Sequence, residues 1–315
     1  MSEPPRGLSG KTLRVPPSVM RLGARQLGRR CLDAKLAWQV QRTRLDQLTA
    51  MVLLPRGTTV DEQTVGGVRA EVVTARTAGP QVTVVHFHGG GYCVGSARTA
   101  RSWAGHLSAA AGCRVVLPEY RLAPEHPHPA ALADARAVVG ALAADVAPGS
   151  LVLSGDSAGG GLALALLLAQ RDEGGPQAAG CILLSPWLDL GRDRRADPGL
   201  VRRDVLLNPD WLDACARAYA GAGALSDSAV SPLHAAHHGL PPLLVQAGTD
   251  ELLAPDAELL AASAAAARVD VTYTKWPRMW HDFALQPGLL AAADSAMAQA
   301  AWFVGKVTSS RDQAA

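Results

Sequence analysis

A serine lies between small residues in the segment Gly155–Gly159, which reads Gly-Asp-Ser-Ala-Gly. The segment follows the aliphatic run Leu151 to Leu153 and precedes an apolar stretch that predicts a helix over Ala158 to Gln170. Small residues at a strand–turn–helix junction allow a sharp turn that exposes the serine hydroxyl above a sheet edge. A bare G-x-S-x-G can arise by chance, but this context predicts that Ser157 is a nucleophile.

A second segment that could take part in catalysis is His88-Gly89-Gly90-Gly91, directly after a predicted strand over Val82 to His86. Three consecutive glycines cost backbone entropy, so a flexible turn or a bulge is one interpretation. The other is a loop whose N–H groups approach a substrate oxygen without interference from a Cβ atom. The nucleophile motif downstream favours this oxyanion loop.

A serine nucleophile needs a base, and nine histidines compete for that role. His281 follows the last predicted strand, where a base would face the serine. His86 and His88 share a face of one strand like a metal pair, but no third ligand has suitable spacing, so no metal is predicted. His88 is instead interpreted as a brace for the glycine loop. The other histidines fall in turns, a surface-like cluster or a helical segment: His106, His126, His128, His234, His237 and His238.

The base in turn needs an acid that orients its ring. Asp250 follows the predicted strand Leu243 to Ala247, and a carboxylate at a strand end can reach a histidine. Glu251 and Asp256 are the alternatives. With Asp250, the chain order is serine, acid, histidine, which is typical of α/β-hydrolases.

Short apolar runs alternate with helical stretches along most of the chain, which predicts an α/β fold with a mostly parallel sheet covered on both faces. Residues 1–54 are predicted as an N-terminal helical cap region that starts with a loose arm over residues 1–17. Residues 55–315 are predicted as the catalytic domain. An insertion at about 187–232 interrupts the alternation and is expected to contribute to the cap.

Composition and charge exclude several classes of protein. Apolar residues make up 48% of the 315 residues and charged residues 18%, which fits a globular protein with a sizeable core. The net charge of +2 gives no indication of nucleic-acid binding. Ten Lys/Arg against three Asp/Glu in the first fifty residues most simply indicate a solvated basic face, although a membrane surface or a transit peptide is the alternative.

The cysteines and the hydropathy bear on location. Five dispersed cysteines without C-x-x-C pairing indicate a reducing compartment rather than a disulfide framework. No secretory signal is recognisable, and the longest apolar stretch, Gly161 to Ala169, is far too short to span a bilayer. The sequence therefore predicts a cytoplasmic protein without stable membrane insertion. A homodimer is possible.

Taken together, these motifs make the chain resemble the hormone-sensitive-lipase-like branch of the esterases, the bacterial family IV carboxylesterases. The resemblance is carried by His88–Tyr92, Tyr120–Glu125, Gly155–Gly160 and the pair Asp250 and His281. It implies an α/β-hydrolase fold with an N-terminal cap and activity on short-to-medium acyl esters, without a cofactor. In many relatives Gly-Phe follows the base and the acid lies in Asp-Pro-Leu, whereas this chain has Asp282-Phe283 and Asp250-Glu251-Leu252. We expect Asp282 to perturb the base electrostatically.

The resemblance also implies site residues. The amides of Gly90, Gly91 and Ala158 would form the oxyanion hole, and Tyr120, Arg121 and Glu125 would form a structural turn rather than catalytic groups. Tyr92 and Trp280, which stand beside the glycine loop and the base, are candidates for the substrate pocket.

The expected reaction is hydrolysis of an ester through an acyl-enzyme on Ser157, with His281 as base and Asp250 as orienting acid. An amidase, an arylformamidase or a lactonase would use the same triad. A non-catalytic ligand receptor on this scaffold is a third reading, against which the presence of His281 argues.

Overall fold

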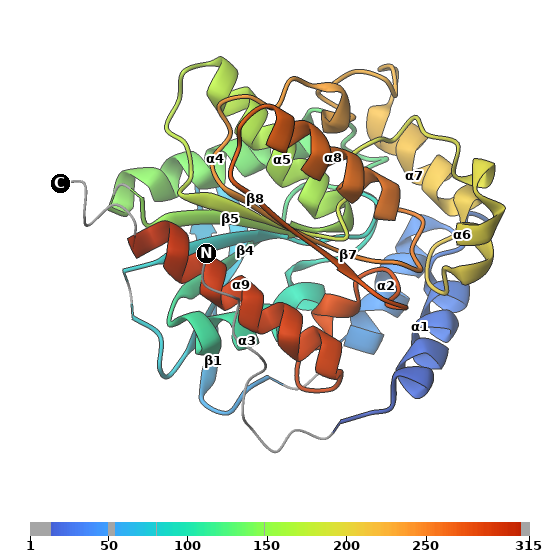
Figure 1. Cartoon of the computed structure of the whole chain (residues 1–315), viewed down its shortest axis with the longest axis horizontal. Coiled ribbons are helices and arrows are strands. Elements are labelled where there is room, and N and C mark those ends of the chain that lie inside the picture. Colours follow the sequence, from blue (N-terminus) through green and yellow to red (C-terminus); the bar gives the residue numbers. More distant parts are fainter. Residues whose placement is uncertain (1–13, 50–53, 80, 148, 310–315) are drawn as a thin grey trace.

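Eight strands form one twisted sheet in the computed structural model, which describes residues 14–49, 54–79, 81–147 and 149–309 (Figure 1). Their order across the sheet is β1-β2-β4-β3-β5-β6-β7-β8. β2 pairs antiparallel with β1 and β4, and all other neighbours are parallel, so the predicted mostly parallel sheet is confirmed. The bounds are β1 Thr58–Val65, β2 Val68–Ala75, β3 Thr83–Phe87, β4 Arg114–Pro118, β5 Leu151–Asp156, β6 Gly180–Leu184, β7 Leu243–Gly248 and β8 Val271–Trp276.

The central strands and the outermost strand differ in burial. Every residue of β3, β5, β6 and β7 is buried, because helices cover both faces of the parallel strands. β1 reads Thr-Thr-Val-Asp-Glu-Gln-Thr-Val and is mostly exposed. The sequence pattern predicts no strand there, because an antiparallel edge strand held by backbone hydrogen bonds needs little apolar sequence.

Among the residues that the structure describes, five helices form the two outer layers. Two core clusters mark the layers: α3 (Ala97–Ala111) and α9 (Ala291–Ser309) contribute to one, and α4 (Ala130–Asp145), α5 (Ser157–Asp172) and α8 (Ala254–Ala266) to the other. Figure 1 shows α3 and α9 on one side of the sheet and α4, α5 and α8 on the opposite side. The helix α8 has no counterpart among the predicted elements.

Four further helices gather at one end of the sheet (Figure 1): α1 (Pro17–Cys31), α2 (Trp38–Thr49), α6 (Pro198–Arg203) and α7 (Pro209–Ala220). We call them the cap helices. The two chain segments are joined by side chains, since Trp211 Nε1 donates to Gln41 Oε1 at 2.8 Å and Asn208 Nδ2 donates to the Leu32 carbonyl at 3.1 Å. Of the predicted loose arm, residues 1–13 lie outside the described residues.

The cysteines and the helices also bear on the expected setting. All five cysteines are buried and unpaired. Within the described ranges, none of the helices combines the length and the apolarity needed to cross a bilayer.

Candidate active site

Ser157 occupies a sharp junction between β5 and α5. Its φ of 51° lies in the left-handed region, where non-glycine residues are uncommon and strained. The flanking glycines make the turn possible: a Cβ atom on Gly159 would lie 1.9 Å from the Phe87 carbonyl oxygen, and one on Gly155 would lie 2.2 Å from the Gly159 oxygen. The G-x-S-x-G spacing therefore follows from close backbone packing that holds the hydroxyl above the sheet.

His281 is the histidine next to this hydroxyl. Its Nε2 lies 3.0 Å from Ser157 Oγ, and the residue is only 2% exposed. It stands in the loop between β8 and the 3-10 turn Phe283–Leu285. The structure thus brings Ser157 and His281 together although 124 positions separate them.

The carboxylate that meets the other ring nitrogen is Glu251, and the expectation that Asp250 holds the ring is wrong. Glu251 Oε2 lies 3.0 Å from His281 Nδ1, and Glu251 Oε1 accepts from the Gly248 N–H at 2.9 Å. The glutamate is fully buried. Its longer side chain folds back under the end of β7, where it can reach the ring.

Asp250 turns toward the cap helices instead. Its Oδ2 lies 3.0 Å from Arg21 Nη1 of α1, and its Oδ1 lies 3.6 Å from Arg203 Nε of α6. The other alternative, Asp256, is buried against the Arg194 guanidinium at 2.7 Å and accepts from the Leu188 and Asp189 N–H groups. These two carboxylates are satisfied by arginines, which leaves Glu251 for the histidine.

The glycine loop lies opposite Ser157. Gly90 and Gly91 have φ of 113° and 60°, conformations open to glycine. Their N–H groups donate to no acceptor among the described residues, whereas the Gly89 N–H donates to Asp156 Oδ2 at 2.9 Å. Two N–H groups of this loop are therefore available to a substrate oxygen.

Two histidines and Asp156 hold this loop. His86 Nε2 lies 3.0 Å from Asp156 Oδ1, and His88 Nδ1 lies 2.8 Å from the Gly89 carbonyl oxygen. The His88 ring stacks on Tyr120 at 4.3 Å. The role of Asp156 was not predicted from the sequence, although its place inside the nucleophile motif was a signal. Within the described residues, no group of three or more His, Cys, Asp or Glu side chains is placed to hold a metal ion.

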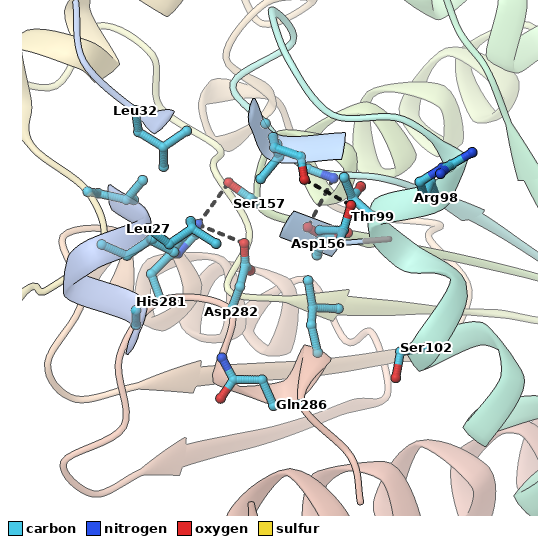
Figure 2. A pocket seen from close by; sticks show the side chains of 18 of the residues that line it. Leu27, Leu32, Arg98, Thr99, Ser102, Asp156, Ser157, His281, Asp282 and Gln286 are labelled. Atoms are coloured by element: carbon cyan, nitrogen blue, oxygen red, sulfur yellow. Dashed lines mark hydrogen bonds and ion pairs between the residues drawn. The ribbon is translucent and has the colours of Figure 1, made fainter. Parts of the chain in front are cut away.

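A cavity of about 400 Å³ opens onto Ser157 and His281 (Figure 2). Leucines and Trp211 from the cap segments line one part of it, and Thr99, Ser102, Asp282 and Gln286 line another. In Figure 2, Leu27 and Leu32 lie to one side of Ser157, and Thr99 and Ser102 lie to the other. The cavity is therefore apolar towards the cap and polar towards α3.

The two residues predicted for the pocket do not line this cavity. Tyr92 is buried and stacks on Tyr219 with ring centroids 3.7 Å apart, and Trp280 is 1% exposed within the core beneath α9. Both predictions were wrong because neighbours in sequence project to opposite sides of a loop. Trp211 of α7, a buried side chain of the core, also lines the cavity.

Carboxylates dominate the electrostatics around the base. Burial alone would lower the pKa of His281, but Asp282 and Glu251 outweigh it and raise that pKa well above 6.5. Burial raises the pKa of Asp282 to about 7, against the opposing effect of His281. Burial also raises the pKa of Asp204 to about 6, although three backbone N–H groups stabilise its charge.

Comparison with known proteins gives consistent matches. The model of a family described by the alpha/beta hydrolase fold matches residues 84–285. LipR of Mycobacterium tuberculosis is 37% identical over 283 residues, which are 89% of this chain and 90% of that protein. An acetyl-hydrolase of Streptomyces hygroscopicus is 40% identical over 223 residues, 70% of this chain and 74% of that protein.

A solved structure agrees with these sequence matches. The crystal structure of an esterase from the bacterial hormone-sensitive lipase family superposes with a TM-score of 0.87 at 33% identity. The match covers 93% of this chain and all of that one. The similarity therefore extends over the cap helices as well as the sheet.

Proposed function

Because this chain belongs to the α/β-hydrolase-fold family, we propose that it is a serine carboxylesterase with Ser157, His281 and Glu251 as its triad. The observation that carries the proposal is the continuous chain of contacts from Ser157 Oγ to Nε2 and from Nδ1 to Glu251, each 3.0 Å long. Ser157, at one end of this series of contacts, faces a cavity large enough for a small ester.

The first step forms an acyl-enzyme. With Nδ1–H held by the Glu251 carboxylate, the Nε2 lone pair of His281 faces the Ser157 hydroxyl and accepts its proton as Oγ attacks the ester carbonyl. The imidazolium then gives this proton to the leaving alcohol as the C–O bond breaks. Water repeats the sequence on the acyl-enzyme and releases the carboxylic acid.

The oxyanion that forms during attack needs donors. The N–H groups of Gly90 and Gly91 have no acceptor among the described residues, and Ala158 lies in the first turn of α5, where N–H groups lack helical partners. We assign these three amides to the oxyanion hole. Loss of one well-aligned donor of this kind costs about 3 kcal/mol of transition-state stabilisation.

The cavity supports short-to-medium acyl groups. Its apolar part is built by Leu27 and Leu32 of the first cap segment and by Leu206 and Leu207 of the second. A volume of about 400 Å³ must hold both the acyl and the alcohol portions. The described parts of residues 1–54, together with residues 187–232, are thus proposed to act as a cap that limits the length of the acyl chain.

The protein is proposed to act on small-molecule esters in the cytoplasm. Five buried cysteines without disulfide partners support a reducing compartment. Electrophoresis of freshly isolated protein with and without reductant tests this point, since a mobility change would indicate disulfides and contradict it.

Replacement of the nucleophile tests the function. Ser157→Ala should lower kcat/KM for p-nitrophenyl butyrate by about 10⁴-fold or more, because the covalent step is lost. Ser295→Ala is the matched control, because Ser295 is a half-buried serine of α9 that lines no part of the cavity and donates its hydroxyl hydrogen to the Ala291 carbonyl. Retained turnover in Ser157→Ala would sink the assignment. A panel of ester, amide and lactone substrates with the same acyl group then measures the preference of the site.

A further inference from the structure

Two oxygen atoms lie close to the same nitrogen of the base. His281 Nε2 lies 3.0 Å from Ser157 Oγ and also 3.1 Å from Asp282 Oδ2, and Figure 2 marks both contacts. A serine hydroxyl can donate to Nε2 or accept from it, but an ionised carboxylate can only accept. The contact with Asp282 therefore restricts where protons can be.

The contacts of the two ring nitrogens of His281 set how many protons the ring and its carboxylates must hold. The contact between Glu251 and Nδ1 needs a proton on Nδ1, because the carboxylate has none to give. The contact between Nε2 and Asp282 needs a second proton, either on the nitrogen or on the carboxyl group. In both cases the Nε2 lone pair is occupied and cannot accept the proton of Ser157.

The ring is the partner of the Asp282 side chain. Its Oδ2 contacts His281, and its Oδ1 is buried without a hydrogen-bond partner among the described residues. The backbone of Asp282 is held independently, since its φ is 57° and its N–H donates to Ser185 Oγ at 3.2 Å. The carboxyl group is therefore not needed to shape the loop.

We propose that Asp282 is a positioning residue that shares one proton with His281 Nε2, and that this proton must leave before Ser157 can be activated. The inference rests on the proposed function, because it concerns the base of the same triad.

The other charges near the ring do not replace Asp282. Glu251 contacts Nδ1, Asp204 acts on the ring without a hydrogen bond to it, and Asp156 is held by His86 and the Gly89 N–H. The nearby cations Arg21 and Arg203 are paired with Asp250. The raised pKa of His281 and that of Asp282 describe the same shared proton.

The step balances as a simple ionisation. Below the midpoint, the proton lies between Nε2 and Oδ2, and Ser157 keeps its hydroxyl hydrogen. Above it, the proton passes to solvent, and a neutral ring with a free Nε2 lone pair faces Ser157 beside an ionised Asp282. During attack, the serine proton moves to Nε2, and the Asp282 carboxylate then stabilises the imidazolium. The acidic limb of activity should accordingly lie above pH 6.5 in the unaltered protein.

The pH profile of kcat/KM for p-nitrophenyl butyrate tests the proposal. Asp282→Asn keeps the side-chain shape, tolerates a positive φ and removes the charge. It should move the midpoint of the acidic limb down by at least one pH unit, which is about tenfold in relative rate on that limb. Asp204→Asn is the matched control: it removes a nearby carboxylate that does not touch the ring and should shift the midpoint by less than half as much. Equal midpoints in Asp282→Asn and the unaltered protein would overturn the proposal.

A direct titration makes the result independent of turnover. The imidazole resonances of His281 followed by NMR in the Ser157→Ala background should titrate above pH 6.5, and lower when Asp282→Asn is added. An unchanged titration contradicts the shared proton even if the variant is inactive. If the unaltered protein hydrolyses no ester, the proposed function fails, whereas ester hydrolysis with an unmoved limb rejects only the role of Asp282.

Discussion

The turn after β5 and the turn after β7 both deliver one reacting side chain to His281, but they specify it differently. At the first, a Cβ on Gly155 would collide with the Gly159 backbone and one on Gly159 with the Phe87 carbonyl of β3, so the glycines beside Ser157 mark how closely this turn is packed. At the second, two adjacent carboxylates, Asp250 and Glu251, share the strand end. Which one meets the ring depends on Arg21 and Arg203, contributed by distant cap helices.

The two turns therefore differ in how far the local sequence predicts the position of the side chain. Backbone packing at the first turn leaves a pattern of glycines that can be read directly. Partner choice at the second turn leaves no local pattern, because an arginine more than 200 positions away takes one of the two carboxylates. Substitutions at the two turns should therefore fail in different ways.

Next to loss of the nucleophile itself, a large effect on rate is expected at the second turn, for the carboxylate that meets the ring. Glu251→Gln should lower kcat/KM by about 10³- to 10⁴-fold, because an amide cannot stabilise the imidazolium and favours the wrong tautomer of His281. Steady-state kinetics with p-nitrophenyl butyrate measures this. A loss below tenfold would contradict the role of Glu251, and Asp250 would again be the candidate for the orienting acid.

At the first turn, the effect should appear in folding. Gly159→Ala should lower the free energy of unfolding by about 3 kcal/mol, because its Cβ would meet the Phe87 carbonyl oxygen at 1.9 Å. Denaturant titration measures the change. Gly23→Ala in α1 is the matched control: its Cβ would meet nothing within 4 Å, and alanine should stabilise the helix by roughly 0.5–1 kcal/mol. Equal changes in the two variants would show that close backbone packing at the turn between β5 and α5 does not contribute to stability.

The smallest effect is expected for the carboxylate that the ring does not use. Asp250→Asn should change kcat/KM by less than about threefold and the free energy of unfolding by about 1 kcal/mol, because it weakens a partly exposed ion pair with Arg21. The same assay and denaturation curve report both values. If Asp250→Asn is as damaging as Glu251→Gln, the two carboxylates do not differ in the way described.

The same contrast explains how much the sequence could predict. The parallel strands, the helix after Ser157 and the position of His281 next to it follow from apolar runs and from motif order, which are local or nearly local signals. The role of Glu251 and the edge strand β1 could not be predicted, because both depend on contacts between segments far apart in the chain. Trp280 shows the same limit, since its neighbour His281 faces the serine while the indole packs into the core.

Asp156 has a consequence for how the site responds to a ligand. One of its oxygens accepts from the Gly89 N–H and the other contacts His86, while its own backbone leads directly into Ser157. The positions of the nucleophile and of the oxyanion loop are thereby coupled through Asp156. A bulky acyl group that displaces the glycine loop should also displace Ser157. We therefore expect a poorly fitting substrate to lower kcat as well as the binding affinity.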